Sequence, residues 1–96
     1  MDTDQIIDDL LEKLSSIEHA RWARWQAYLH SNAITQPDGS LTIPRELVEH
    51  WQRQIETPYE ALSDQEKESD REQVREYLDI IKDALRGQAN RAKCNI

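Results

Sequence analysis

Charged side chains interrupt the apolar stripe of a helix predicted near the C-terminal end of the sequence. The stripe consists of apolar residues at spacings of three and four: Val74, Tyr77, Leu78, Ile81 and Leu85. The same spacing, extended backwards, passes through Arg71, Asp70 and Lys67. Two cations on an inward-facing line suit an anionic ligand, and Asp70 suits a structural pairing role beside them. Two other interpretations remain open, a helix end that leaves the core for water and a structural cluster of ion pairs.

An aromatic face accompanies these charges on the predicted first helix. Glu18, Trp22 and Trp25 share one side of that helix, and His19 lies on an adjacent line. Aromatic rings stack on planar bases, and Arg24 supplies a further cation for phosphate. Packing in the core is the alternative role for His19 and Trp22, and a solvated surface is the alternative for Arg24. Glu18 is expected to take part in structural pairing.

The residue sets that catalyse reactions are absent from the sequence. It has no nucleophile elbow, no His-Glu-x-x-His and, with two glycines, no phosphate-cradling loop. His19, His30 and His50 have no spacing that specifies a metal site. The single cysteine, Cys94, excludes an intrachain disulfide and fits a reducing, cytoplasmic location. We therefore predict that the protein is not an enzyme and uses no cofactor or metal.

Length and charge narrow the classes of partner. A chain of 96 residues fits one small domain, and its net charge of −7 argues against a surface for duplex nucleic acid. No apolar run approaches the length of a membrane span, and the N-terminal residues lack the pattern of a secretory signal. Neither duplex nucleic acid nor a membrane is therefore expected as a partner.

The chain is predicted to be all-α, a small bundle of about three helices. Apolar residues with a helical period, uninterrupted by Gly or Pro, predict a long first helix over 4–30. A turn over 36–40 and a short extended arm over 41–43 follow. Pro44 suits the start of a second helix that ends near Glu56.

Two capping signals start the remaining helical segments. Two residue pairs have the capping-box spacing, Thr57 with Glu60 and Ser63 with Glu66. The first predicts a single turn, and the second predicts a last helix that stops at Gly87. One domain is therefore predicted over 1–87, with a flexible tail over 88–96.

The first half of the long helix predicts self-association. A helix of about 40 Å overhangs a domain this small, so its aliphatic stripe has little of its own chain to pack against. The residues of that stripe are Ile6, Leu10 and Leu14. We expect a homo-oligomer, most simply a dimer through these side chains.

Two segments together resemble the RyR domain, the small helical module repeated in ryanodine receptors and also found singly in bacteria and phages. They are His19-x-x-Trp22 and the segment from Pro58 to Arg71, which contains Tyr-x-x-Leu and Glu-Lys-x-x-Asp-Arg. The similarity spans about residues 17–81. The Trp-Ala-Arg-Trp segment and the Asp-Gly-Ser-Leu turn also look like those of small phage and prophage proteins.

The resemblance implies binding rather than catalysis. Receptor repeats look like scaffold and regulatory modules, and prokaryotic relatives have been suggested as sensors of nucleotide signals made from NAD. We therefore expect a non-catalytic phage-type protein that is a sponge or sensor for a small anionic nucleotide, NAD-derived or cyclic, and counteracts host defence in the host cytoplasm. The residues expected to contact this ligand are Trp22 and Tyr59 by stacking, and Lys67, Arg71 and Arg24 at phosphate, with His19 beside them.

Two other functions remain open at this point. The first is a protein-interaction adaptor or inhibitor that acts through its helical and Trp-bearing faces. The second is a minor structural component of a virion, which only the phage-like resemblance suggests. The sequence alone does not decide between a small molecule and a protein as the partner.

Overall fold

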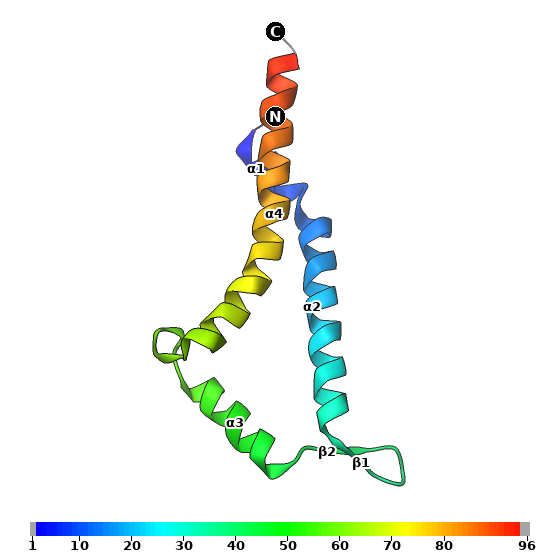
Figure 1. The fold of residues 1–96 in the computed structure, drawn as a ribbon. Coiled ribbons are helices and arrows are strands. Elements are labelled where there is room, and N and C mark those ends of the chain that lie inside the picture. The colour runs from blue at the N-terminus through cyan, green and yellow to red at the C-terminus, as the bar shows by residue number, and fades with distance from the viewer. Residues whose placement is uncertain (1, 95–96) are drawn as a thin grey trace. The chain divides into compact units, whose positions relative to one another are not determined.

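A computed structural model describes the backbone of residues 2–94 and the side chains of residues 2–87 (Figure 1). Its elements follow in the order α1 (Thr3–Asp8), α2 (Leu11–Asn32), β1 (Ile34–Thr35), β2 (Leu41–Thr42), α3 (Arg45–Glu56), the 3-10 turn η1 (Tyr59–Ala61) and α4 (Asp64–Cys94). The predicted all-α class is confirmed, with its long first helical segment, short extended arm and one-turn helix before the last helix.

Backbone contacts group the residues into two units. The terminal unit joins Met1–Arg21 to Asp70–Ile96, and the central unit is Trp22–Ser69. Helices α2 and α4 both cross the boundary, so each contributes one part to each unit.

A break at Asp9 and Leu10 separates α1 from α2, where one continuous helix was predicted over 4–30. The side chain of Gln5 donates to Asp9 Oδ1 at 2.7 Å, and the Leu10 amide donates to the Ile7 carbonyl at 3.0 Å, the shorter-range bond of a 3-10 turn. Leu10 is 2% exposed and forms the buried core among the described residues. Periodicity could not reveal the break, because apolar residues continue at helical spacing on both sides of it.

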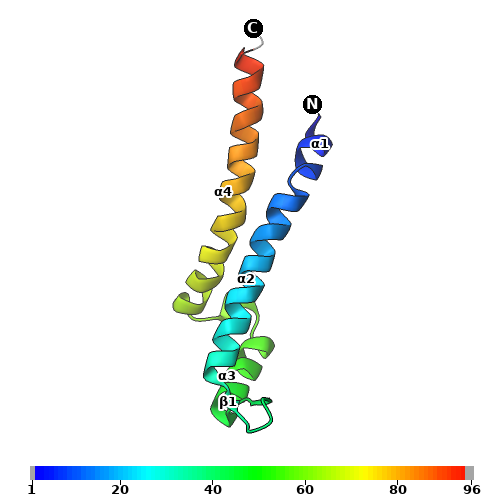
Figure 2. The ribbon, with the colours of Figure 1, turned by 90° about the vertical axis from the view of Figure 1, so that its right-hand side faces the viewer.

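The turn between the two short strands forms as predicted. Strands β1 and β2 pair antiparallel with Thr35 opposite Leu41, and Figure 2 shows this hairpin following α2. Asp38 Oδ1 accepts hydrogen bonds from the Ser40 amide at 2.9 Å and the Ser40 hydroxyl at 2.6 Å. Gly39 has φ of 88°, a left-handed conformation that glycine adopts without a steric penalty. These local bonds explain why the Pro-Asp-Gly-Ser signal was readable from sequence.

Helix α3 has the predicted limits, but the capping box predicted directly after it does not form. It begins after Pro44 and ends at Glu56. The Thr57 hydroxyl donates to the Arg53 carbonyl at 2.5 Å and so closes α3. The capping box predicted for Thr57 with Glu60 is therefore wrong, because η1 starts after Pro58 without a side-chain cap.

The capping box that starts α4 is confirmed. Ser63 Oγ accepts from the Glu66 amide at 3.1 Å, and Glu66 Oε1 accepts from the Ser63 amide at 3.3 Å. Glu66 Oε2 also accepts from Gln54 Nε2 at 2.8 Å, so one carboxylate links α3 to the start of α4. The hydrogen bond from Gln54, followed by those from Ser63, lowers the pKa of Glu66.

Helix α4 is longer than predicted. It continues through Gly87 to Cys94, so the predicted stop at Gly87 is wrong. Glycine costs about 1 kcal/mol relative to alanine inside a helix, a cost that the strong helix formers around it can outweigh. Of the tail predicted over 88–96, residues 88–94 are helical in their backbone, and 95–96 lie outside the described residues.

Candidate binding site

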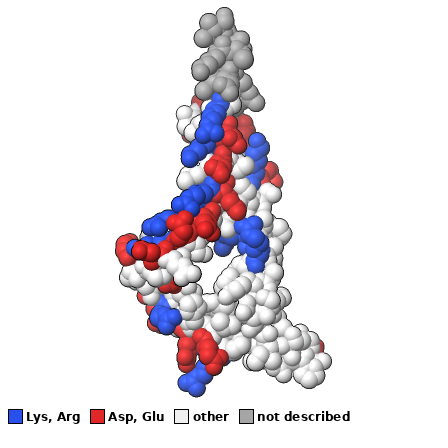
Figure 3. All heavy atoms as spheres, in the orientation of Figure 1, with Lys and Arg blue, Asp and Glu red and all other residues white. Residues whose placement is uncertain are grey.

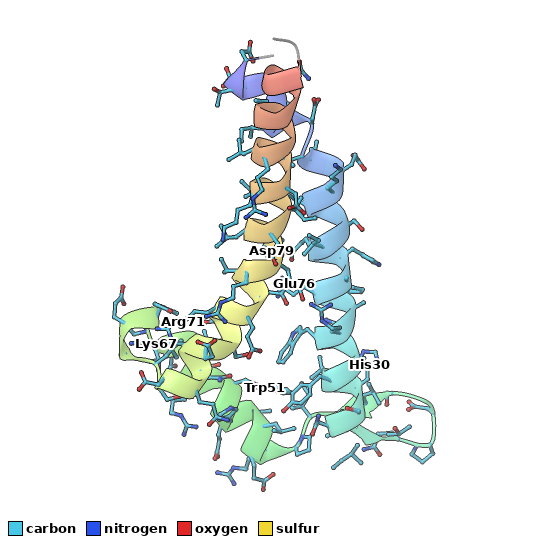
Figure 4. The ribbon with its side chains drawn as sticks, turned by 45° about the horizontal axis from the view of Figure 1, so that its top comes forward. His30, Trp51, Lys67, Arg71, Glu76 and Asp79 are labelled. Atoms are coloured by element: carbon cyan, nitrogen blue, oxygen red, sulfur yellow. The ribbon has the colours of Figure 1, made fainter. Side chains whose placement is uncertain are left out.

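Three aromatic side chains on α2 form an exposed aromatic surface in the central unit. These residues, which we call the aromatic row, are Trp22, Trp25 and Tyr28, and they are 51%, 42% and 50% exposed. Trp25 stacks on Tyr28 with ring centroids 5.7 Å apart and an interplanar angle of 22°. Trp51 of α3, labelled in Figure 4, meets Trp25 edge-on with centroids 5.4 Å apart. Packing therefore supports the row from inside while about half of its surface faces solvent.

The aromatic row lies in a stretch of sequence without acidic residues. No Asp or Glu occurs between Glu18 and Asp38, although the chain has 19 acidic residues in 96. Arg24 and His30 are the basic groups that follow Arg21 in this stretch. Figure 3 shows the contrast, because the surface over the hairpin is mostly uncharged while α4 carries many charges. The aromatic row therefore has no carboxylate among its neighbours in the sequence.

Tyr59 and Lys67 are a second aromatic and cationic pair in the central unit. Lys67 Nζ lies 5.7 Å from the centroid of the Tyr59 ring, a cation–π distance. Tyr59 is exposed on η1, and Lys67 is half-buried on the first turns of α4. The Ser63–Glu66 capping box between them fixes the direction in which α4 starts and so keeps the two groups together.

The residues predicted to bind a ligand are divided between the units. The central unit contains Trp22, Arg24, Tyr59 and Lys67, and the terminal unit contains His19 and Arg71. The structure brings Tyr59 and Lys67 together. Trp22, Arg24, His19 and Arg71 each have an interaction within the chain. The aromatic row adds Trp25 and Tyr28, which the recurrence of aromatic residues every third position on α2 could have suggested.

The inward stripe predicted at the start of α4 is only partly correct. Lys67 is half-buried, whereas Asp70 and Arg71 are exposed and Glu68 is half-buried. Helical spacing gives the direction of a side chain on its own helix, but not whether another element lies opposite it. The burial pattern therefore does not support the structural role predicted for Asp70.

Glu18 is at the centre of a hydrogen-bonded cluster in the terminal unit. Arg21 on the next turn of α2 forms an ion pair with it, with Arg21 Nε 3.1 Å from Glu18 Oε1. The Tyr77 hydroxyl of α4 donates to Glu18 Oε2. The bond from Arg21, then that from Tyr77, lowers the pKa of Glu18 from 4.5 to about 2. The bond to Glu18 also raises the pKa of Tyr77. Sequence did not indicate the Tyr77 contact, because the two residues are 59 positions apart.

The lowered pKa of Glu18 predicts a measurable dependence of stability on pH. A carboxyl whose pKa falls on folding stabilises the folded state above its unfolded pKa, and this contribution is lost as pH falls through the folded pKa. For Glu18 that window runs from 4.5 down to about 2. Across it, the melting temperature of wild type is expected to fall more than that of Glu18→Gln. Glu12→Gln, an exposed change on the same helix, is the matched control and is expected to follow wild type. Parallel curves for wild type and Glu18→Gln would contradict the assignment.

A groove lies along α1 and the first part of α2 in the terminal unit. Its volume is about 620 Å³, and its lining residues are Ile7, Asp8, Leu11, Leu14, Ser15, Glu18 and Tyr77. Most of this lining is apolar, and its two charged groups are carboxylates. None of the residues predicted to bind the nucleotide lines this groove, and of its two carboxylates Glu18 is paired with Arg21.

The stripe predicted to mediate self-association faces inward. Leu10 is 2% exposed, and Ile6 and Leu14 are half-buried. The apolar residues that remain exposed on this segment are Ile7 and Leu11.

Among the described side chains, those of residues 2–87, no group of three or more His, Cys, Asp or Glu is placed to hold a metal ion. None of the helices described there has both the length and the apolar character needed to cross a membrane. Comparison with models of protein families, with curated proteins and with solved structures gives no match.

Proposed function

We propose that this protein is a non-catalytic binding protein whose ligand lies on the aromatic row of the central unit. The observation that carries the proposal is the combination of three half-exposed aromatic rings on one helix with a surrounding stretch that lacks carboxylates. Apolar and aromatic surface exposed in this way commonly marks a binding site.

The chemistry of this surface favours a small anionic ligand that contains a planar base. Stacking of a base on an aromatic side chain contributes about 1–3 kcal/mol. Arg24 in the same stretch and Lys67 beside Tyr59 supply cations for phosphate. On a chain with a net charge of −7, a phosphate is repelled by most of the surface, so a stretch without acid is where it binds at least cost.

The resemblance to the RyR domain agrees with this choice of ligand. The segments that carry the resemblance supply Trp22 of the aromatic row and, separately, the Tyr59–Lys67 pair. We therefore propose a sponge or sensor for an NAD-derived or cyclic nucleotide. If the chain is phage-encoded, sequestering such a signal in the host cytoplasm would counteract host defence.

A thermal-shift panel of mono-, di- and cyclic nucleotides and NAD derivatives tests the proposal. A ligand that binds only the folded state, at about a hundredfold excess over its Kd, raises the free energy of unfolding by about 2.7 kcal/mol. This corresponds to an increase of several degrees in melting temperature for a chain of this size. Trp22→Ala, which removes one ring of the aromatic row, is expected to abolish the shift.

The control for this panel is Arg45→Ala. Arg45 lies on α3 in the same unit, its side chain is 87% exposed, and its Nε is 2.9 Å from Glu49 Oε1. This variant loses a cation outside the proposed surface and is expected to keep the full shift. No shift with any nucleotide at millimolar concentration, or loss of the shift in Arg45→Ala, would refute the proposed ligand.

A protein-interaction adaptor or inhibitor is the second candidate. The observation that favours it is that exposed apolar side chains on α3, Val48 and Ile55, accompany the aromatic row in the central unit. Trp residues on such surfaces frequently dominate the affinity of protein interfaces. Absence of any nucleotide shift, together with loss of a partner's binding in Trp22→Ala, would favour this function.

A further inference from the structure

The terminal unit carries two exposed apolar surfaces of opposite electrostatic character. The first is the groove beside α1 and α2, where Ile7 and Leu11 are exposed and Asp8 and Glu18 are the charged lining groups. The segment that forms it is strongly acidic, because residues 2–12 include five carboxylates and no base. A side chain that enters this groove therefore meets apolar walls and a negative rim.

The second surface is an apolar ridge on α4. It consists of three exposed residues at intervals of four and seven, which place them on one side of the helix: Val74, Leu78 and Leu85. Intervals of this kind are those of helices that pack against a partner helix. In the described structure, the ridge presents its side chains to solvent.

Basic side chains flank this ridge. They recur at intervals of four, seven and four: Arg71, Arg75, Lys82 and Arg86. The first three lie three or four positions from a ridge residue, and Arg86 directly follows Leu85. Figure 3 shows Lys and Arg side chains in a row along α4, beside a row of Asp and Glu. Arg86 is 3.5 Å from Asp83, but both side chains are more than 70% exposed, so exchanging this ion pair for another costs little.

We infer that the groove is an interface for a second copy of this chain, which inserts its α4 ridge. An apolar ridge with basic flanks complements an apolar groove with an acidic rim in both hydrophobicity and charge. Both surfaces belong to the same unit of one chain. In a twofold dimer, the ridge of each copy can therefore enter the groove of the other copy. The interface shares Leu14 with the stripe predicted from sequence, but it does not use Leu10, which is buried within its own chain. It does not depend on the nucleotide proposed above.

Sedimentation equilibrium and light scattering between about 1 and 300 µM test this interface. Wild type is expected to reach twice the 11.3 kDa mass of one chain. Leu11→Asp, which places a charge in the groove at a residue 65% exposed, and Leu85→Asp on the ridge are each expected to weaken the dimer at least about tenfold. Ile55→Asp is the matched control, because Ile55 is 76% exposed on α3 outside both surfaces, and it is expected to leave the mass unchanged.

Reversing one charge on each surface tests the pairing directly. Asp8→Lys at the groove and Lys82→Glu beside the ridge are each expected to weaken the dimer, and the double variant is expected to recover part of the loss. Circular dichroism checks that each variant is folded, and the charge variants serve as the test if Leu11→Asp is not. A wild type that stays monomeric, including one that instead binds an unrelated protein through the groove, overturns the inference. So does a dimer that Ile55→Asp weakens as much as Leu11→Asp, or that no groove or ridge variant weakens.

Discussion

Leu10→Ala is expected to lower the free energy of unfolding by about 2–5 kcal/mol, the range for removing a buried leucine side chain. Leu10 is 2% exposed and lies where the chain leaves α1 and enters α2. Leu10 is the buried apolar side chain of the described residues, so its truncation removes burial that no other described side chain supplies. A loss of this size corresponds to a fall of more than about 10 °C in melting temperature for a chain of this length.

The matched control for Leu10→Ala is Ile55→Ala on α3. Ile55 is 76% exposed, so the change removes little buried area, and alanine has the higher helix propensity. Its melting temperature is expected to stay within a few degrees of wild type. Thermal unfolding followed by far-UV circular dichroism at low protein concentration separates the two variants. Equal melting temperatures would show that Leu10 is not the centre of the terminal core.

Trp51→Ala is expected to have the second-largest effect, a loss of about 2–3 kcal/mol, less than the 3–5 kcal/mol typical of a fully buried tryptophan. Trp51 is half-buried on α3 and meets the edge of Trp25. Its removal takes away the support under the aromatic row and part of the contact between α2 and α3. Chemical denaturation measures the loss.

Trp22→Ala is the control for Trp51→Ala. Trp22 belongs to the aromatic row that Trp51 supports, and it is 51% exposed, so its removal is expected to cost about 1 kcal/mol or less. In the nucleotide assay, by contrast, Trp22→Ala is expected to lose binding although the variant remains folded. A Trp22 variant that is destabilised as much as the Trp51 variant would show that the row is core rather than binding surface.

Features set by local chemistry were predictable from the sequence. The Ser63–Glu66 capping box, the Pro-Asp-Gly-Ser turn and the limits of α3 depend on residues within a few positions of one another, and all three predictions are confirmed. The stop at Gly87 failed, although it is also local. A glycine inside a helix costs about 1 kcal/mol relative to alanine. This cost disfavours the helix at that position but is too small to end it.

Features that depend on a second element were not predictable. The exposure of Asp70 and the half-burial of Glu68 depend on what lies opposite α4, which helical spacing does not report. The bond between Glu18 and Tyr77 joins residues 59 positions apart, and the break at Leu10 interrupts no apolar period. The sequence therefore predicted which types of residue form the candidate site, but it did not predict which of those residues lie together.

The order of the two units along the chain also affects the order in which they can form during synthesis. The central unit, Trp22–Ser69, is continuous, so all of its residues are available once Ser69 has left the ribosome. The terminal unit needs Asp70 and the residues after it, so until they emerge the segment around Leu10 lacks the rest of its unit. Until then the nascent chain exposes the aliphatic segment around Leu10, and a chaperone would bind the nascent chain at this segment.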